Sequence, residues 1–353
     1  MRDRIVTAWP LWSIMVAQIV LAQRWIWGTA PFTDEALYLQ AGHVEWAHWL
    51  HHAPLPDYAT WFSGAPVLYP PLAAIADSAG GLVAARALSM ICMLATTAMV
   101  YLIGSRIFGR RAGALGALVF AVCGLVVHYG ASATFGPPSL LLLVLATWAA
   151  VRVRDGRFAW LPLCVVALTA ANATKYATLA WDPVVMGIIV LHGWDADRWQ
   201  AIGRAASAAT TVVVLDLGLV MFGGPAYARG VVVTTIFRSI HWGAPASAGS
   251  VLAHALALMG SLLLPAVAGV VVSIVTHRPP AMITFLGLLV LAAAVAPIEQ
   301  ARIHQLGSLD KNMAYGLPFA AIGAGYALSE IAISIINNSR FFAVKSGKRR
   351  RTK

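Results

Sequence analysis

Charged side chains are scarce in this sequence, and their scarcity excludes most classes of soluble protein. Asp, Glu, Lys and Arg make up 11% of the 353 residues, whereas hydrophobic residues make up 59%. No polar segment is long enough for a large soluble domain. Apolar stretches of membrane-spanning length recur instead, at residues 82–104, 205–222, 251–275 and 281–298. The composition therefore predicts an all-α, polytopic transmembrane protein.

Other features are also missing. Only three cysteines occur, all within apolar stretches and without an adjacent histidine, so neither a disulfide framework nor a cysteine metal site is expected. The first hydrophobic segment, residues 8–28, lacks a small-residue cleavage site, and we interpret it as a retained helix rather than a signal peptide. No internal repeat is apparent, which counts against an inverted-repeat transporter.

Lysine and arginine are absent between Trp25 and Ala85, and this stretch contains the adjacent acids Asp34 and Glu35. A carboxylate pair at the edge of a bilayer costs free energy unless something uses it. One interpretation is a helix start, with acids favourable to the helix dipole. The other is a catalytic pair, in which Asp34 is a general base and Glu35 orients it. The same two residues are the candidate ligands for a divalent cation such as Mg²⁺ or Mn²⁺. The position at a membrane boundary favours the catalytic interpretation.

Positive charge predicts the topology. With the N-terminus in the cytoplasm, alternate loops are rich in arginine and the opposite loops are poor in it. This asymmetry predicts about ten spans in the plasma (inner) membrane, both termini cytoplasmic, and the acidic pair on the extracytoplasmic face. Residues 1–336 then form one transmembrane domain. The basic tail, residues 337–353, is expected to bind anionic lipid headgroups rather than nucleic acid.

The first outer loop, about residues 29–81, has its own pattern. Residues 35–50 predict an amphipathic helix lying on the membrane surface. Its expected apolar face is Leu37, Leu39, Ala41, Val44, Trp46 and Trp49, and its expected polar face includes Gln40, His43, Glu45 and His48. A second long outer loop is expected at residues 223–250.

Several bases fall on the outer side, where they would suit a phosphate carried by a lipid. Lys175 interrupts an apolar stretch, and interrupted helices are tolerated where backbone lines a cavity. Ordinary anchoring at the membrane interface is the alternative for any single base. The set consists of Lys175, Arg229, Arg238, Arg302 and Lys311.

Six short motifs follow one another along nearly the whole chain: residues 32–38 (FTDEALY), 64–72 (GAPVLYPPL), 85–89 (ARALS), 106–111 (RIFGRR), 174–177 (TKYA) and 300–311 (QARIHQLGSLDK). In these motifs and in their order the chain resembles the GT-C superfamily of membrane glycosyltransferases, near the protein-O-mannosyltransferase and aminoarabinose-transferase type (glycosyltransferase family 39).

The resemblance implies an inverting enzyme that transfers a sugar from a polyprenyl-phosphate donor to an acceptor glycan, lipid or protein outside the membrane. It implies that Asp34 is the base and that Glu35 supports it. The residues we expect at the donor phosphate are Lys175, Arg238, Arg302 and Lys311, and those we expect at the substrate are Tyr69, Tyr176 and His304.

The chain departs from the family pattern at Gly136, where related sequences often carry a second acidic residue. That role is then missing, or it falls to another acid such as Asp57 or Asp77. Two alternatives therefore stay open. One is a transporter or flippase, for which Asp216 is the one acid in the middle of a span. The other is a non-catalytic relative that binds glycolipid.

Overall fold

The computed structural model describes residues 9–28, 30–156, 159–235 and 245–350, with side chains through residue 336. The described residues contain no β-strand, which confirms the all-α prediction. Their α-helices, in chain order, are α2 Trp9–Trp27, α3 Thr33–His51, α4 Tyr69–Phe108, α5 Arg110–Val122, α6 Gly124–Gly130, α7 Gly136–Arg152, α8 Trp160–Thr174, α9 Asp182–Thr235, α10 Ala248–Val275, α11 Pro280–Arg302, α12 Leu309–Met313 and α13 Leu317–Arg350. Three short 3₁₀ turns are η1 Tyr58–Thr60, η2 Val153–Asp155 and η3 Tyr176–Trp181.

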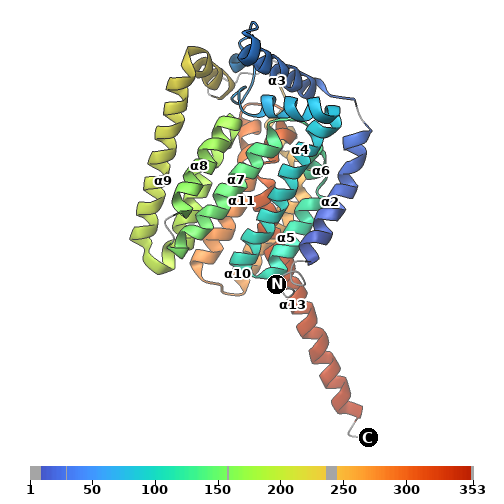
Figure 1. Ribbon diagram of the computed structural model, residues 1–353. Coiled ribbons are helices and arrows are strands. Elements are labelled where there is room, and N and C mark those ends of the chain that lie inside the picture. Colours follow the sequence, from blue (N-terminus) through green and yellow to red (C-terminus); the bar gives the residue numbers. More distant parts are fainter. Residues whose placement is uncertain (1–8, 29, 157–158, 236–244, 351–353) are drawn as a thin grey trace.

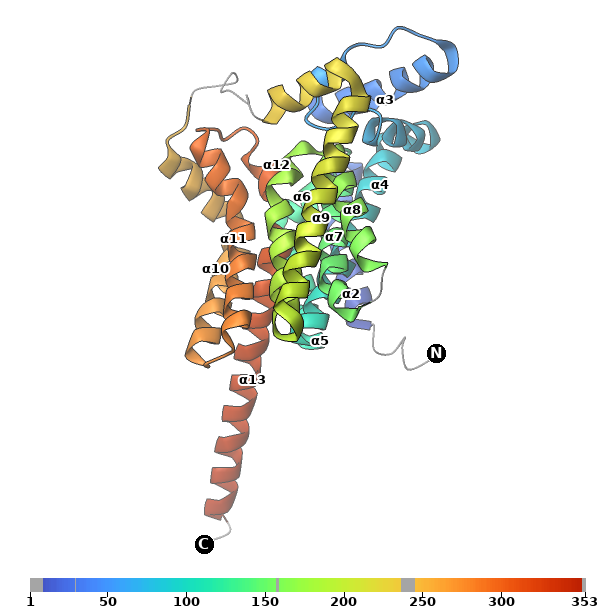
Figure 2. The same ribbon diagram turned by 90° about the vertical axis from the view of Figure 1, so that its left-hand side faces the viewer.

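The long helices form a bundle around a common axis (Figure 1). Helix α3 lies across one end of the bundle, and α13 projects beyond the other end (Figures 1 and 2). Small residues allow the closest contacts in the interior. A Cβ atom at Gly325 of α13 would lie 2.3 Å from the carbonyl oxygen of Ala112 in α5. Only glycine permits that approach.

Among the residues that the structure describes, six helices are long and apolar enough to cross a membrane, or up to seven if the bent pair α5 and α6, at 68°, is one span. The expectation of about ten spans is not confirmed by this count. Helix α8 is too short to be included, and α9 is counted once although its backbone leaves helical geometry at Asp197 and Gly224. The four apolar stretches identified in the sequence lie within α4, α9, α10 and α11. The chain is an integral membrane protein.

The first outer loop is largely helical. Helix α3 spans nearly the residues expected, and α4 begins with Tyr69 followed by Pro70. Gly81, with φ of 64°, breaks α4 where the loop was predicted to end. The predicted faces of α3 were wrong in part. Glu45, assigned to the polar face, is only 1% exposed, whereas Trp49, assigned to the apolar face, is 43% exposed.

Helix α9 turns back on itself. It passes along the bundle, reverses at Asp197, and returns beside α8 to Gly224, where a positive φ of 79° turns its last part across the α3 end (Figure 2). Residues 225–235 are therefore helical, and the second outer loop begins later than the sequence predicted. Pro225 directly follows the second break, as expected for a residue that cannot donate a helical hydrogen bond.

Ion pairs between arginines and acids join helices at the end of the bundle opposite α3. Asp155 pairs with Arg106 and with Arg152, which joins the end of α4 to the end of α7. Arg278 pairs with Glu330 at 2.9 Å, which joins the turn before α11 to α13. Arg106, Arg152 and Arg278, all on the side predicted to be cytoplasmic, thus lie at one end of the molecule.

Candidate active site

A polar pocket of about 260 Å³ opens at the α3 end of the bundle. Its walls come from segments that are far apart in the sequence: the start of α3, the turn between α6 and α7, the break before η3, and α12. The pocket combines carboxylates, lysines and hydroxyl groups. Its lining residues are Phe32, Asp34, Tyr38, His128, Tyr129, Ser132, Thr134, Phe135, Gly136, Lys175, Asp310 and Lys311.

Asp34 carries its carboxylate into this pocket and pairs with Lys311. The Oδ2 atom of Asp34 lies 2.5 Å from Nζ of Lys311, although the residues are 277 positions apart. Both side chains keep about a third of their surface exposed, 33% for Asp34 and 38% for Lys311. The Lys311 ammonium also lies 5.7 Å from the ring centroid of Phe32, a cation–π contact. A ligand can therefore reach both members of the pair.

Glu35 points the other way, into the protein, and is fully buried. Arg86 donates to Oε1 from Nε at 2.9 Å and to Oε2 from Nη2 at 2.6 Å. The backbone N–H groups of Ala133 and Phe32 donate at 2.7 Å and 3.4 Å. Four donors thus meet the roughly four lone-pair sites of a carboxylate. A bidentate pair satisfied in this way holds α3, α4 and the turn before α7 together.

Arg86 was not predicted as a partner of the acidic pair. It is the first base after the base-free stretch, and it begins the membrane-spanning part of α4 just after the break at Gly81. Its remaining donors bind the carbonyl oxygens of Trp25, Ile26 and Ala30, at 3.1–3.3 Å. Arg86 therefore fixes the end of α2 as well as the start of α3.

Lys175 enters the pocket from the break between α8 and η3. Its backbone is extended, with φ of −149° and ψ of 107°, so the predicted interruption is confirmed. The Nζ atom donates to the hydroxyl of Ser63 in the first outer loop. The backbone of Ala65 donates to the carbonyl of Ala173 at 2.8 Å, which holds the same loop against the break. Lys175 thus shares the pocket with Asp34 and Lys311.

The floor of the pocket explains why residue 136 is glycine. A Cβ atom built at Gly136 would lie 2.0 Å from the phenol of Tyr129, so no other residue fits while that ring is in place. The Tyr129 hydroxyl bonds to the hydroxyl of Tyr315, which lies 2.7 Å from Oγ of Ser139. The phenol of Tyr129 therefore fills the space that a side chain at residue 136 would need.

Two tyrosines, Tyr38 in the pocket wall and Tyr315 buried behind it, stay neutral at physiological pH. Tyr38 lies one helical turn after Asp34, and burial followed by the charge of Asp34 raises its pKa well above the usual value. Burial also raises the pKa of Tyr315 to about 12. Tyr38, which lines the pocket, can therefore donate a hydrogen bond to a ligand. Tyr315 is fully buried and bonds to Ser139 and Tyr129 instead.

The other residues predicted for the site lie elsewhere. Arg302 is exposed and pairs with Glu299 at 2.6 Å, and the ring of His304 contacts the carbonyl of Ala246 at 2.9 Å. Tyr69 is buried beside Ser89, and Tyr176 lines a separate cavity with η3, α9 and α11. Arg238 is outside the described residues. The structure therefore brings Asp34, Lys175 and Lys311 together in one pocket. Tyr38, Tyr129 and Asp310 also line this pocket and were not predicted for the site.

A cation held jointly by Asp34 and Glu35 does not fit this arrangement, because Arg86 and two backbone N–H groups already use the oxygens of Glu35. Within the described ranges, no group of three or more His, Cys, Asp or Glu side chains could hold a metal ion. Asp216 does not line the pocket. Its carboxylate accepts from Nδ2 of Asn172 at 3.0 Å, as does that of Asp182.

Solved structures share this architecture. ArnT from Cupriavidus metallidurans in its apo state matches with a TM-score of 0.63 and 17% identity, over 92% of this chain and 60% of that chain. The same protein bound to undecaprenyl phosphate gives 0.64 and 16%, with the same coverage. The oligosaccharyltransferase AglB from Archaeoglobus fulgidus, in complex with an inhibitory peptide and a dolichol-phosphate, gives 0.59 and 15%, over 95% and 52%.

The chain has the GT-C fold. The resemblance inferred from the sequence motifs is therefore confirmed in the architecture. A family model described as dolichyl-phosphate-mannose-protein mannosyltransferase matches residues 70–217, from α4 into the second leg of α9. No curated protein matches the chain. The chain spans about three fifths of the length of the ArnT structures.

Proposed function

We propose that this protein transfers a sugar from a polyprenyl-phosphate donor to a hydroxyl group of an acceptor. The observation that carries the proposal is the Asp34–Lys311 pair in a pocket that also contains Lys175. A carboxylate can accept a proton from a hydroxyl nucleophile, and ammonium groups can bind a phosphate. The GT-C fold and the lipid phosphates in the two neighbouring structures support this choice of donor.

The proposed step is a single displacement at the anomeric carbon. The acceptor oxygen forms a bond to that carbon while the bond from the carbon to the phosphate oxygen breaks, and the configuration inverts. The acceptor proton goes to Asp34. The electron pair of the broken bond stays on the phosphate, which gains a negative charge. Lys311 and Lys175 stabilise this charge, and such stabilisation is often the largest contribution to catalysis.

The Asp34–Lys311 ion pair is the arrangement of the protein without substrate. A phosphate would compete with Asp34 for the Lys311 ammonium, because both are anionic oxygen groups. Donor binding would then free an oxygen of Asp34 to accept the acceptor proton. Donor binding thus prepares the base.

Glu35 acts as a positioning residue in this proposal. It does not face the pocket, but it fixes the first turn of α3 on Arg86 and on the backbone of Ala133. Since the preceding residue of the same turn, Asp34, carries the base, this anchor sets the position of Asp34. No step of the proposed reaction passes through a metal ion.

The proposed location follows from the arginine-rich end of the bundle. With that end in the cytoplasm, the pocket faces the extracytoplasmic side of the plasma (inner) membrane. The acceptor is a glycan, a lipid or a protein of the cell envelope. The sugar belongs to the hexoses or pentoses carried on polyprenyl phosphate.

The test is release of polyprenyl phosphate from a panel of polyprenyl-phosphate sugars by the reconstituted protein, with membrane extract as acceptor. We expect Asp34→Asn to lower the rate by about two to four orders of magnitude while the protein folds normally. Asp77→Asn is the matched control, because Asp77 lies outside the pocket and pairs with His43. Wild-type turnover in Asp34→Asn would rule out the assigned base. Turnover absent from the wild-type protein with every donor would overturn the proposed activity.

A further inference from the structure

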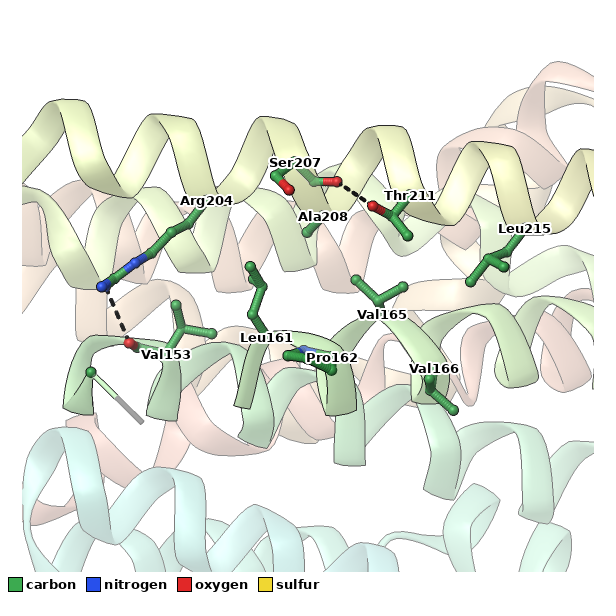
Figure 3. A pocket seen from close by; sticks show the side chains of 11 residues that line it. Val153, Leu161, Pro162, Val165, Val166, Arg204, Ser207, Ala208, Thr211 and Leu215 are labelled. Carbon is green, nitrogen blue, oxygen red and sulfur yellow. Dashed lines mark hydrogen bonds between the residues drawn. The ribbon is translucent and has the colours of Figure 1, made fainter. Parts of the chain in front are cut away.

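A second cavity, of about 500 Å³, lies between α8 and the returning leg of α9 (Figure 3). None of its lining residues belongs to the Asp34 pocket. Figure 3 shows α9 contributing Arg204, Ser207, Ala208, Thr211 and Leu215, and α8 contributing Leu161, Pro162, Val165 and Val166. The proposed glycosyl transfer does not use this cavity.

The depth of the cavity corresponds to one leaflet of a bilayer. Its α9 wall extends from Arg204 to Leu215, which is about 16 Å at a rise of about 1.5 Å per residue. The hydrocarbon core of a bilayer is about 30 Å thick. A hydrocarbon chain that begins at Arg204 and follows α9 would therefore reach the middle of the membrane near Leu215.

The two ends of the cavity differ in chemistry. At one end Arg204 is half-buried and reaches across to α7 and η2, where its Nη1 atom donates to the Val153 carbonyl at 3.2 Å (Figure 3). A guanidinium has five N–H donors, and this carbonyl takes one of them. The opposite end is apolar, with Val166 and Leu215. Between them, the Thr211 hydroxyl donates to the carbonyl of Ser207 at 2.8 Å, so it is satisfied within α9.

The surroundings of the charged end are basic overall. Arg154 is exposed in η2, next to the Val153 carbonyl that Arg204 contacts. The nearest acid in that turn is Asp155, and both Arg106 and Arg152 pair with it. Basic pockets between membrane helices attract anionic lipid headgroups. The basic end and the length of the cavity therefore both favour an anionic lipid with one acyl chain in the cavity.

We propose that this cavity binds an anionic phospholipid from the leaflet opposite α3, with its phosphate at Arg204 and one acyl chain between α8 and α9. A polyprenyl chain is the competing occupant, because Val166 and Leu215 also line a larger apolar groove of about 900 Å³ nearer α3. The position of the charge favours the phospholipid. Arg204 lies at the end remote from the Asp34 pocket, where a donor phosphate would not lie.

Such a lipid would connect two helices. It would contact Val165 of α8 and Ala208 of α9, which are already buried against the rest of the bundle. Because binding to the folded state stabilises it, phosphatidylglycerol should raise the thermal unfolding midpoint more than phosphatidylcholine does.

The test is lipid retention by the full-length protein, measured by native mass spectrometry with phosphatidylglycerol, phosphatidylcholine or polyprenyl phosphate added. We expect preferential retention of phosphatidylglycerol, and a loss of about fivefold in Arg204→Gln, corresponding to one headgroup contact. Arg198→Gln is the matched control, because it removes the same charge from the same end while Arg198 lies over the ring of Trp199. The control should retain the lipid as the wild type does.

A second variant tests the chain site independently of the charge. Thr211→Phe adds bulk at an exposed position of the cavity wall and should reduce retention while Arg204 is intact. Equal retention of the two phospholipids, or equal effects of Arg204→Gln and Arg198→Gln, would overturn the proposal. Retention of polyprenyl phosphate alone, unaffected by Arg204→Gln, would assign the cavity to a prenyl chain and would also overturn it.

Discussion

Asp34 and Glu35 are joined by one peptide bond, yet they belong to two different regions of the molecule. Asp34 lies in an open polar pocket, is 33% exposed and pairs with a lysine that a ligand can reach. Glu35 lies in a closed region, has no exposed surface and accepts four hydrogen bonds. Successive residues of a helix point about 100° apart, so adjacent acids need not share a role. Asp34 is therefore placed to contact a ligand, whereas Glu35 holds the start of α3 in position.

A third acid on α3 extends the comparison. Glu45 lies on the same buried stripe as Glu35, but its Oε2 atom has no hydrogen-bond partner in the described structure. Burial raises the pKa of Glu45 above its usual value, whereas a nearby histidine opposes the shift only in part. The presence of an arginine partner distinguishes Glu35 from Glu45.

The largest effect on folding should come from breaking the closed region. Arg86→Met leaves the Glu35 carboxylate buried without its main partner, and breaking a buried ion pair costs about 3–5 kcal/mol. We expect a large drop in the thermal unfolding midpoint in detergent. Arg24→Met is the matched control, since Arg24 is exposed over the ring of Trp25. The double variant Glu35→Leu/Arg86→Met should be more stable than Arg86→Met alone. A less stable double variant would contradict the role given to the buried Glu35–Arg86 ion pair.

Substitutions in the open pocket should change the kinetics of sugar transfer and leave the stability of the fold nearly unchanged. Lys311→Met and Lys175→Met each remove an ammonium group from the pocket, and a hydrogen bond to a charged group contributes about 1.5–3 kcal/mol. We therefore expect KM for the donor to rise by about ten- to hundredfold, with little change in the unfolding midpoint. Arg302→Met is the comparison, because Arg302 is exposed and pairs with Glu299. An equal rise in KM for Arg302→Met would contradict the choice of lysines.

The packing between the pocket and the closed region can be tested at Gly136. Gly136→Ala places a methyl group 2.0 Å from the Tyr129 ring, and overpacking of this kind costs about 1–3 kcal/mol. Gly124→Ala is the matched control, since nothing lies within 4 Å of its Cβ position. The unfolding midpoint should fall for the first variant and not for the second. In a Tyr129→Ala background, Gly136→Ala should cost much less than it does in the wild type, and an undiminished cost would contradict the steric explanation.

The smallest effect concerns Glu45 and depends on pH. Since the folded-state pKa of Glu45 is raised, the folded protein binds a proton more tightly than the unfolded chain does, and the carboxyl lowers stability as pH rises above the unfolded pKa. Glu45→Gln should therefore raise the unfolding midpoint at pH 8, by an amount corresponding to about 1 kcal/mol, and change it little at pH 4. A lower midpoint at pH 8 would show that Glu45 has a partner as a charged group.

Much of the fold was accessible from the sequence, because membrane-spanning helices need long apolar runs and breaks need particular residues. The interruption at Lys175 and the end of the first outer loop near Gly81 were both predicted, and both are found. The orientation of α3 was not. Periodicity distinguishes apolar from polar faces, but it does not show that Arg86 allows Glu35 into the interior.

The candidate site was predictable only in part. Asp34 and the distant bases Lys175 and Lys311 could be selected from charge and topology, and the structure brings these three together. Arg302 and His304 lie near Lys311 in sequence but outside the pocket, because α11 ends before the chain turns into α12. The Tyr129–Gly136 contact was inaccessible, since it depends on a turn whose shape no local pattern specifies.

The division of labour between Asp34 and Glu35 can be tested most directly by measuring polyprenyl phosphate binding and sugar transfer in the same Asp34→Asn protein. With its counter-charge removed, Lys311 is free to bind phosphate, so we predict a dissociation constant equal to or lower than that of the wild type. We predict that transfer is lost. Binding and transfer that decline together would show that Asp34 holds the site rather than acting as the base, and this result would contradict the proposed mechanism.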